Sequence, residues 1–125
     1  YTEANSTPLV RMIRSDDDGR SFGSPVTIDA NSPVGRVDID FLDGGDAVVS
    51  WMGKNDRDEG ALLWRVISNT GRLGPLRTVT RMSTRRNAGF PQMSRVGDGL
   101  LFAWTDTSRD ASTIRTARVL FHHRN

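Results

Sequence analysis

Two stretches, GRVDIDFLDGGDAVVSW at 35–51 and GFPQMSRVGDGLLFAW at 89–104, decide the fold class. Each places an apolar-containing run before a turn rich in Asp and Gly, and a second apolar run after that turn. Asp and Gly tolerate the positive φ values that tight hairpin turns require. Each stretch therefore predicts two short antiparallel strands joined by a tight turn.

The two hairpins also match each other. Gly35 aligns with Gly89 and Ile39 with Met93, 54 positions on, and a one-residue deletion in the turn then aligns Trp51 with Trp104. A similar spacing relates RVI at 65–67 to RVL at 118–120. The repeating unit is about 53 residues of four short strands, close to the period of β-propeller blade repeats.

The predicted fold is therefore all-β, a partial β-propeller of about 2.4 four-stranded antiparallel blades. Residues 1–125 belong to a single propeller domain: 8–28 form the outer strands of one blade, 36–80 a complete blade and 90–121 most of a third. A β-sandwich is the alternative. In the propeller Trp51 and Trp104 occupy equivalent sites in neighbouring sheets, whereas in the sandwich they face each other across one core.

The amino-acid composition excludes several kinds of binding partner. The 125 residues are 36% hydrophobic and 26% charged, with a formal net charge of +2 and no cysteine. Disulfides and thiolate metal sites are excluded, and no run reaches the roughly 20 apolar residues of a membrane span. Basic residues are scattered among acids, which disfavours nucleic-acid binding. Because an open set of blades exposes apolar faces, we expect either further blades of a longer chain or self-association.

A specific motif lies in RSDDDGRSFGSP at 14–25, on the predicted turn between two outer strands. Ser15, Asp17, Gly19 and Phe22 have the spacing S-x-D-x-G-x-x-F, which resembles the Asp box of the sialidase-like (BNR-repeat) propellers. A degenerate copy, SNTGRLGP at 68–75, keeps Ser68 and Gly71 but not the Asp. Asp17 is expected to accept backbone hydrogen bonds within its own turn, and Phe22 to pack as an apolar plug between blades. A calcium loop is the competing interpretation.

The resemblance implies a six-bladed propeller, a secreted or periplasmic location, and cleavage of terminal sialic acid by the enzymes of the family. It implies a site on the face built by the loops before the first strand and after the second strand of each blade. Arg36 and Arg86 stand at or just before the start of such first strands and are the candidates for binding a substrate carboxylate, with Arg85 as rival to Arg86. The acids available on this face are Asp56, Asp58, Glu59, Asp106 and Asp110.

The catalytic residues stay unassigned. The family's nucleophile is a Tyr–Glu pair, and the one tyrosine here is Tyr1, at the end of the sequence. No cofactor or metal site is predicted; adjacent His122 and His123 would point to opposite sides of a strand. Trp51, Trp64 and Trp104 are expected in the core rather than stacked on sugars. Two functions remain: part of a sialidase-like glycoside hydrolase that recognises a terminal acidic sugar and is inactive alone, or a non-catalytic propeller module that binds glycan or protein.

Overall fold

The chain is all-β. The computed structural model describes residues 2–4, 7–83, 89–107 and 111–121. Beside one short 3-10 turn at Asp43–Gly45, the described residues form ten strands: β1 (Thr2–Ala4), β2 (Thr7–Met12), β3 (Val26–Asp29), β4 (Gly35–Phe41), β5 (Ala47–Lys54), β6 (Gly60–Ile67), β7 (Arg77–Arg81), β8 (Gly89–Val96), β9 (Gly99–Asp106) and β10 (Thr113–Leu120). None of the described segments is a helix long and apolar enough to cross a membrane.

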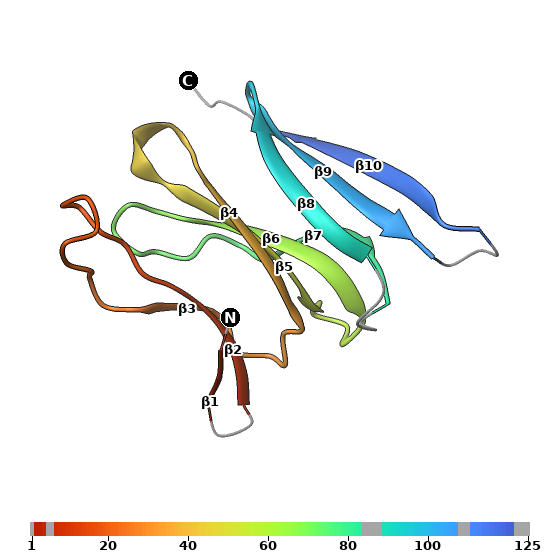
Figure 1. Ribbon diagram of the computed structural model, residues 1–125, viewed down its shortest axis with the longest axis horizontal. Coiled ribbons are helices and arrows are strands. Elements are labelled where there is room, and N and C mark those ends of the chain that lie inside the picture. Colours follow the sequence, from red (N-terminus) through yellow and green to blue (C-terminus); the bar gives the residue numbers. More distant parts are fainter. Residues whose placement is uncertain (1, 5–6, 84–88, 108–110, 122–125) are drawn as a thin grey trace.

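The strands pair with their neighbours in sequence to give three antiparallel sheets. Their orders are β1-β2-β3, β4-β5-β6-β7 and β8-β9-β10. Figure 1 shows the three sheets following one another through the molecule, without closing into a ring. The hairpins predicted at 35–51 and 89–104 are β4–β5 and β8–β9, while the three-residue strand β1 was not predicted from the sequence.

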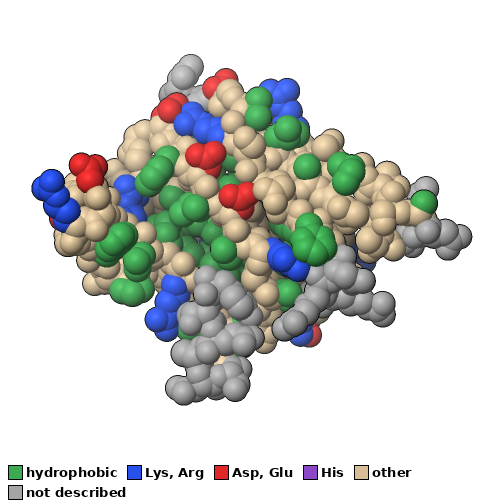
Figure 2. All heavy atoms as spheres, viewed as in Figure 1, with side chains coloured by type: hydrophobic (Ala, Val, Ile, Leu, Met, Phe, Trp, Pro, Cys, Tyr) green, Lys and Arg blue, Asp and Glu red, His purple; other side chains and the backbone are tan. Residues whose placement is uncertain are grey.

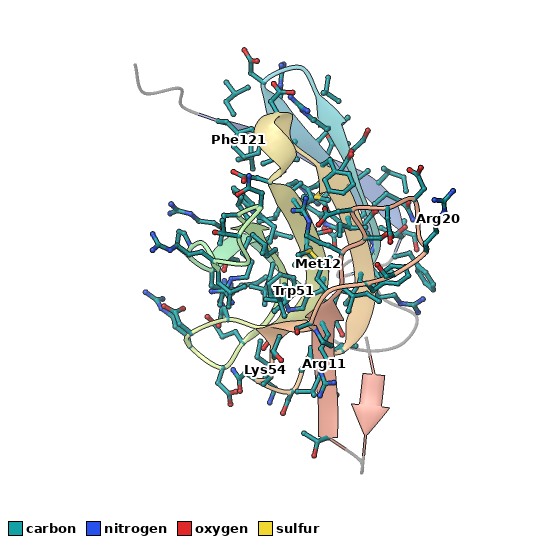
Figure 3. All side chains as sticks on the ribbon, turned by 90° about the vertical axis from the view of Figure 1, so that its left-hand side faces the viewer. Arg11, Met12, Arg20, Trp51, Lys54 and Phe121 are labelled. Atoms are coloured by element: carbon teal, nitrogen blue, oxygen red, sulfur yellow. The ribbon has the colours of Figure 1, made fainter. Side chains whose placement is uncertain are left out.

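Two separate cores hold the three sheets together. The first lies between the β1-β2-β3 sheet and the central sheet, and it contains Val10, Met12, Ile28, Val49, Trp51 and Leu63. The second lies between the central sheet and the β8-β9-β10 sheet, and it contains Val48, Leu62, Trp64, Met93, Phe102 and Trp104. Figure 3 shows Met12 and Trp51 together in the first core. The central sheet is therefore apolar on both of its faces.

The positions of Trp51 and Trp104 argue against the predicted β-sandwich. Trp51 lies on β5 and belongs to the first core, whereas Trp104 lies on β9 and belongs to the second. Each indole packs toward the preceding sheet, so the two residues hold equivalent positions and do not face each other. The prediction of core tryptophans is confirmed, since all three are at least nine-tenths buried. The arrangement is a stack of three sheets rather than a two-sheet sandwich.

One alignment from the sequence is wrong by a single residue. The match of RVI to RVL pairs Arg65 with Arg118, but Leu63 lies opposite Trp51 and Arg115 lies opposite Trp104. The structural spacing is thus 52, and Ala117 takes the place of Arg65. Because side chains alternate along a strand, a slip of one residue reverses every face. Arg118 consequently points away from the core to which Ala117 and Val119 contribute.

The connections between strands gather at two opposite ends of the molecule. The β2–β3, β4–β5, β6–β7 and β8–β9 connections lie at one end, and the β5–β6 connection and the start of β4 lie at the other (Figure 1). This second end is called the loop face below. The segregation agrees with the predicted sorting of loops, and it places the motif at 15–22 away from the loop face.

Candidate functional site

A repeated β-bulge shapes the start of β4 and of β8, which are called the inner strands below. Gly35 and Arg36 have φ values of 111° and 56°, and Gly89 and Phe90, 54 residues on, have values of 84° and 42°. A positive φ is uncommon for residues other than glycine, so its recurrence at Arg36 and Phe90 marks a defined feature. The strand register shifts at the same place in both copies, as expected for bulges that redirect a side chain.

The bulges bring Arg36 and Phe90 together. The guanidinium carbon of Arg36 lies 4.2 Å from the centre of the Phe90 ring, a cation–π geometry. Both side chains are exposed and border a shallow hollow of about 290 Å³, which is completed by Val37, Asp38, Pro91 and Gln92. Arg36 is thus an exposed residue whose guanidinium lies over an exposed aromatic ring.

Arg36 and Arg86 are not structural equivalents. The partner of Arg36 in the repeat is Phe90, because both residues follow the glycine of the same bulge. Arg85 and Arg86 lie outside the described residues, so Arg86 stays a prediction from the sequence.

The acids of the loop face are engaged in ion pairs. Glu59 Oε2 accepts a hydrogen bond of 2.9 Å from Arg81, and Asp106 Oδ2 lies 2.5 Å from Arg115 Nε. Asp58 lies 3.5 Å from Lys54. The hydrogen bonds from Arg81 and Asn55 lower the pKa of Glu59 from its ordinary value, so this carboxylate is stabilised in its ionised form. A lowered pKa suits charge pairing rather than proton donation to a leaving group.

The other two predicted acids of the loop face are Asp56 and Asp110. Asp56 is exposed on the β5–β6 connection, and Asp110 lies outside the described residues. His122, His123 and Tyr1 also lie outside them. Within the described ranges, no three metal-ligating side chains gather in one place.

The predicted Asp box forms a closed network of hydrogen bonds on the β2–β3 connection. Ser15 Oγ accepts from the Gly19 N–H at 2.8 Å and donates to Asp17 Oδ1 at 2.8 Å. Asp17 in turn accepts from the Ser21 N–H at 2.8 Å and from the Ser21 hydroxyl at 2.6 Å. These bonds lower the pKa of Asp17 from its ordinary 3.8 to about 2, chiefly through Ser21.

The network gives the loop at residues 15–21 a local structural role, which agrees with the predicted use of Asp17. Both oxygens of Asp17 are occupied by donors from its own loop, which disfavours the calcium interpretation. The expected role of Phe22 is wrong, however: its side chain is 57% exposed and packs between no two sheets of the described chain. The loop closes through polar bonds and through the Gly23 N–H to Arg14 carbonyl bond of 2.8 Å, so it does not depend on an apolar plug.

Two aspartates that the sequence analysis missed join the inner strands. Asp38 Oδ2 accepts the Met93 N–H at 3.0 Å, and Asp40 Oδ2 accepts the Arg95 N–H at 3.3 Å. Strands β4 and β8 belong to different sheets, so these carboxylates satisfy N–H groups on the unpaired edge of β8. The alternation in VDIDF was the available signal, since every second residue faces the next sheet.

A second hollow of about 1030 Å³ lies beside the loop face, between β7 and the β9–β10 pair. Its lining is rich in hydroxyls and includes the charged side chains of Arg81, Asp106 and Arg115. Trp104 borders it but is only 8% exposed, so little of the indole is available for stacking on a ligand. The tryptophans therefore act in packing, and the exposed ring on the loop side is that of Phe90.

Comparison with known proteins gives no relative for this chain: no family model, no curated protein and no solved structure matches it.

Proposed function

We propose that the chain is part of a sialidase-like, Asp-box β-propeller whose loop face binds a terminal acidic sugar through Arg36. The three successive sheets, the 54-residue recurrence of the inner-strand bulge and the hydrogen-bonded loop at Ser15–Ser21 support this assignment. In this reading β4–β7 are the four strands of one blade, β2–β3 are outer strands of the blade before it, and β8–β10 are three strands of the blade after it.

The observation that carries the ligand assignment is the position of Arg36 over Phe90. A guanidinium forms planar two-pronged hydrogen bonds with carboxylates, which suits the carboxylate of an acidic sugar. The Phe90 ring restricts the guanidinium and offers an apolar surface for the ring carbons of the ligand. Binding of this kind is weak and depends on charge, as expected for one exposed contact.

The geometry favours binding over hydrolysis by this chain. Glycoside hydrolysis requires two positioned carboxyl groups, one of which is protonated. Glu59 is stabilised as a carboxylate by Arg81, and Asp106 is paired with Arg115. We therefore propose a carbohydrate-binding role for these residues and expect no turnover of a fluorogenic sialoside.

Titration with N-acetylneuraminic acid tests the proposal, with chemical shifts of the backbone amides as readout. Arg36→Ala should weaken binding about tenfold, since a hydrogen bond to a charged group contributes about 1.5 kcal/mol or more. Arg36→Lys keeps the charge but loses the planar fork, so it should weaken binding less. Arg20→Ala removes an exposed arginine from the opposite end of the molecule and is the matched control.

Three results would contradict the proposal. Binding that is equal in the wild-type chain and in Arg36→Ala would remove the site. Equal binding of a neutral sugar of the same size would show that the carboxylate is not recognised. Sialoside turnover that persists through repurification and disappears in Arg36→Ala would overturn the binding-only role.

A further inference from the structure

The two faces of the inner strand β4 are unequal. Toward β8 it presents Asp38 and Asp40, whose Oδ2 atoms satisfy N–H groups of that strand. On its other face the side chains of Val37, Ile39 and Phe41 are 46%, 55% and 60% exposed. Contiguous rows of half-exposed apolar side chains are uncommon on protein surfaces, because such rows associate with other chains.

This exposed face continues into a hollow of about 320 Å³ between β2 and β4. Its apolar lining is here named the acceptor groove and consists of Val10, Met12, Ile13, Val37, Ile39 and Val49. Figure 2 shows apolar side chains gathered around a hollow in the left half of the view, on the side of the molecule that Figure 1 presents. The groove is therefore part of a continuous apolar surface.

The internal repeat shows what covers such a face. Met93 holds the position of Ile39 in the next unit, and there the side chain is 8% exposed because β4 and the central sheet lie over it. The Met93 N–H bonds to Asp38 of the strand before it at 3.0 Å. In β4 the equivalent Ile39 N–H reaches only the Oδ1 atom of its own neighbour Asp38, at 2.9 Å. Phe41 repeats this relationship through Asp40, at 2.8 Å.

The edge of β2 also has room for a further strand. Strand β1 pairs with β2 at Thr7–Leu9, with Thr2 opposite Leu9. Val10, Arg11 and Met12 pair with β3 on one side, and on the other side the described residues provide no strand for them. A strand that runs in line with β1 would pair with this edge and cover the acceptor groove.

We propose that the acceptor groove binds a β-hairpin built like β4–β5 and presented in line with β1. The outer strand of that hairpin extends β1 along Val10–Met12. Its inner strand lies on β4 and carries side-chain oxygen acceptors at two alternate positions, opposite the N–H groups of Ile39 and Phe41. The inference rests on the repeated-blade architecture in the proposed function, but not on the sugar site at Arg36.

The three-stranded sheet of a second copy does not fit this place. Val10 and Met12 of β2 contribute to the first core. Leu62 and Trp64 of β6, the third strand of the central sheet, contribute to the second core in the same way. In its own sheet β2 therefore already holds the position of a third strand. A docked β8-β9-β10 sheet would bring its third strand, β10, into the space of β2. A two-stranded hairpin fills the groove without that overlap.

A tandem variant tests the inference. Residues 35–52 are added in front of Thr2, in place of Tyr1, because Thr2 stands opposite Leu9 as Gly53 stands opposite Ala61. We expect hydrogen exchange at the Ile39 and Phe41 amides to slow at least about fivefold relative to the original chain, since each gains an intersheet hydrogen bond. The matched control carries alanine at both aspartates of the added segment, and it should not protect these two amides.

A second variant keeps the test decisive if the tandem protein is poorly soluble. Ile39→Lys in the original chain places a charge in the groove, and it should abolish binding of a separate peptide of residues 35–54. Ile114→Lys changes another exposed isoleucine, on β10, and should leave peptide binding unchanged. Unchanged exchange at Ile39 and Phe41 in a folded tandem protein, or peptide binding that ignores Ile39→Lys, would overturn the inference. So would burial of these residues by self-association of the original chain, measured by sedimentation.

Sugar binding gives an independent readout. If the tandem protein protects Ile39 and Phe41 but Arg36→Ala does not alter sugar binding, the groove is retained and the sugar site fails. The opposite result rejects the groove and keeps the sugar site.

Discussion

Asp38 and Met93 lie 55 positions apart in the sequence, yet the Asp38 carboxylate accepts the Met93 N–H at 3.0 Å and so joins two sheets that share no backbone pairing. The same carboxylate accepts the N–H of Ile39 through its other oxygen. Each inner-strand aspartate thus bridges the edge of its own strand and the edge of the next.

Asp38→Ala should lower the free energy of unfolding by about 1–3 kcal/mol, because it leaves the Met93 N–H without its acceptor. Asp38→Asn keeps one side-chain oxygen and should cost less. Urea denaturation gives the stability, and hydrogen exchange at Met93 tests the cause. Hydrogen exchange at the Met93 amide should be faster in Asp38→Ala than in Asp38→Asn, because only alanine removes the acceptor. An equal loss of unfolding free energy in both variants would argue against this role of Asp38.

The hydrogen-bonded loop around Asp17 should make stability depend on pH in the acid range. Folding lowers the pKa of Asp17 from 3.8 to about 2, so its contribution is fully present above pH 3.8 and is lost as the pH falls through about 2. An NMR titration of the Asp17 carboxyl should show the low midpoint. Ser21→Ala removes the hydrogen bond that the Ser21 hydroxyl donates to Asp17, so it should raise the midpoint of the Asp17 titration. Ser24→Ala should leave that midpoint unchanged. A midpoint near 3.8 in the wild-type chain would contradict the network.

Trp51 and Trp104 offer a matched comparison of one hydrogen bond. The Trp51 indole donates to Asp29 Oδ2 at 2.6 Å, while the residue that the repeat places at the Asp29 position for Trp104 is Thr80, whose hydroxyl donates to Arg81. Trp51→Phe should therefore cost about 1–2 kcal/mol more than Trp104→Phe. Equal losses in thermal or urea unfolding would mean that Asp29 contributes nothing to the packing of the two sheets.

Gly99 and Gly97 should respond differently to alanine. A Cβ at Gly99 would overlap the backbone oxygen of Val119, which belongs to the paired strand β10. Gly99→Ala should cost about 3 kcal/mol through displacement of β10. Gly97 has open space around it and a φ of 56°, so Gly97→Ala should cost only about 1 kcal/mol of backbone strain. Similar unfolding midpoints for the two variants would contradict the close approach at Gly99.

The parts of the fold that depend on local pattern were predictable. Alternating apolar residues and Asp-Gly turns placed β4–β5 and β8–β9, and the spacing of Ser15, Asp17 and Gly19 anticipated a loop closed by its own side chains. Both signals involve residues close in sequence, where chain geometry leaves few choices.

The errors arose where position depends on contacts between sheets. A one-residue slip in the third sheet made Arg118 look like the partner of Arg65, and only the pairing of Arg115 with Trp104 sets the register. The sequence singled out Arg36, but its repeat partner Phe90 was missed because the bulge, not the residue type, defines the position. Asp38 and Asp40 resemble ordinary solvated strand residues until the neighbouring sheet is placed.

Strand β5 ties the two cores to each other. Val48 and Val49 are neighbours in the chain, yet one belongs to the second core and the other to the first, and neither side of the strand meets solvent. Loss of either outer sheet would uncover a row of uncharged residues with high β-propensity, the type of segment that seeds aggregation. Each outer sheet therefore protects the chain from aggregation by covering one face of β5. Local unfolding of one outer sheet would be enough to expose that face, even while the other sheet stays folded.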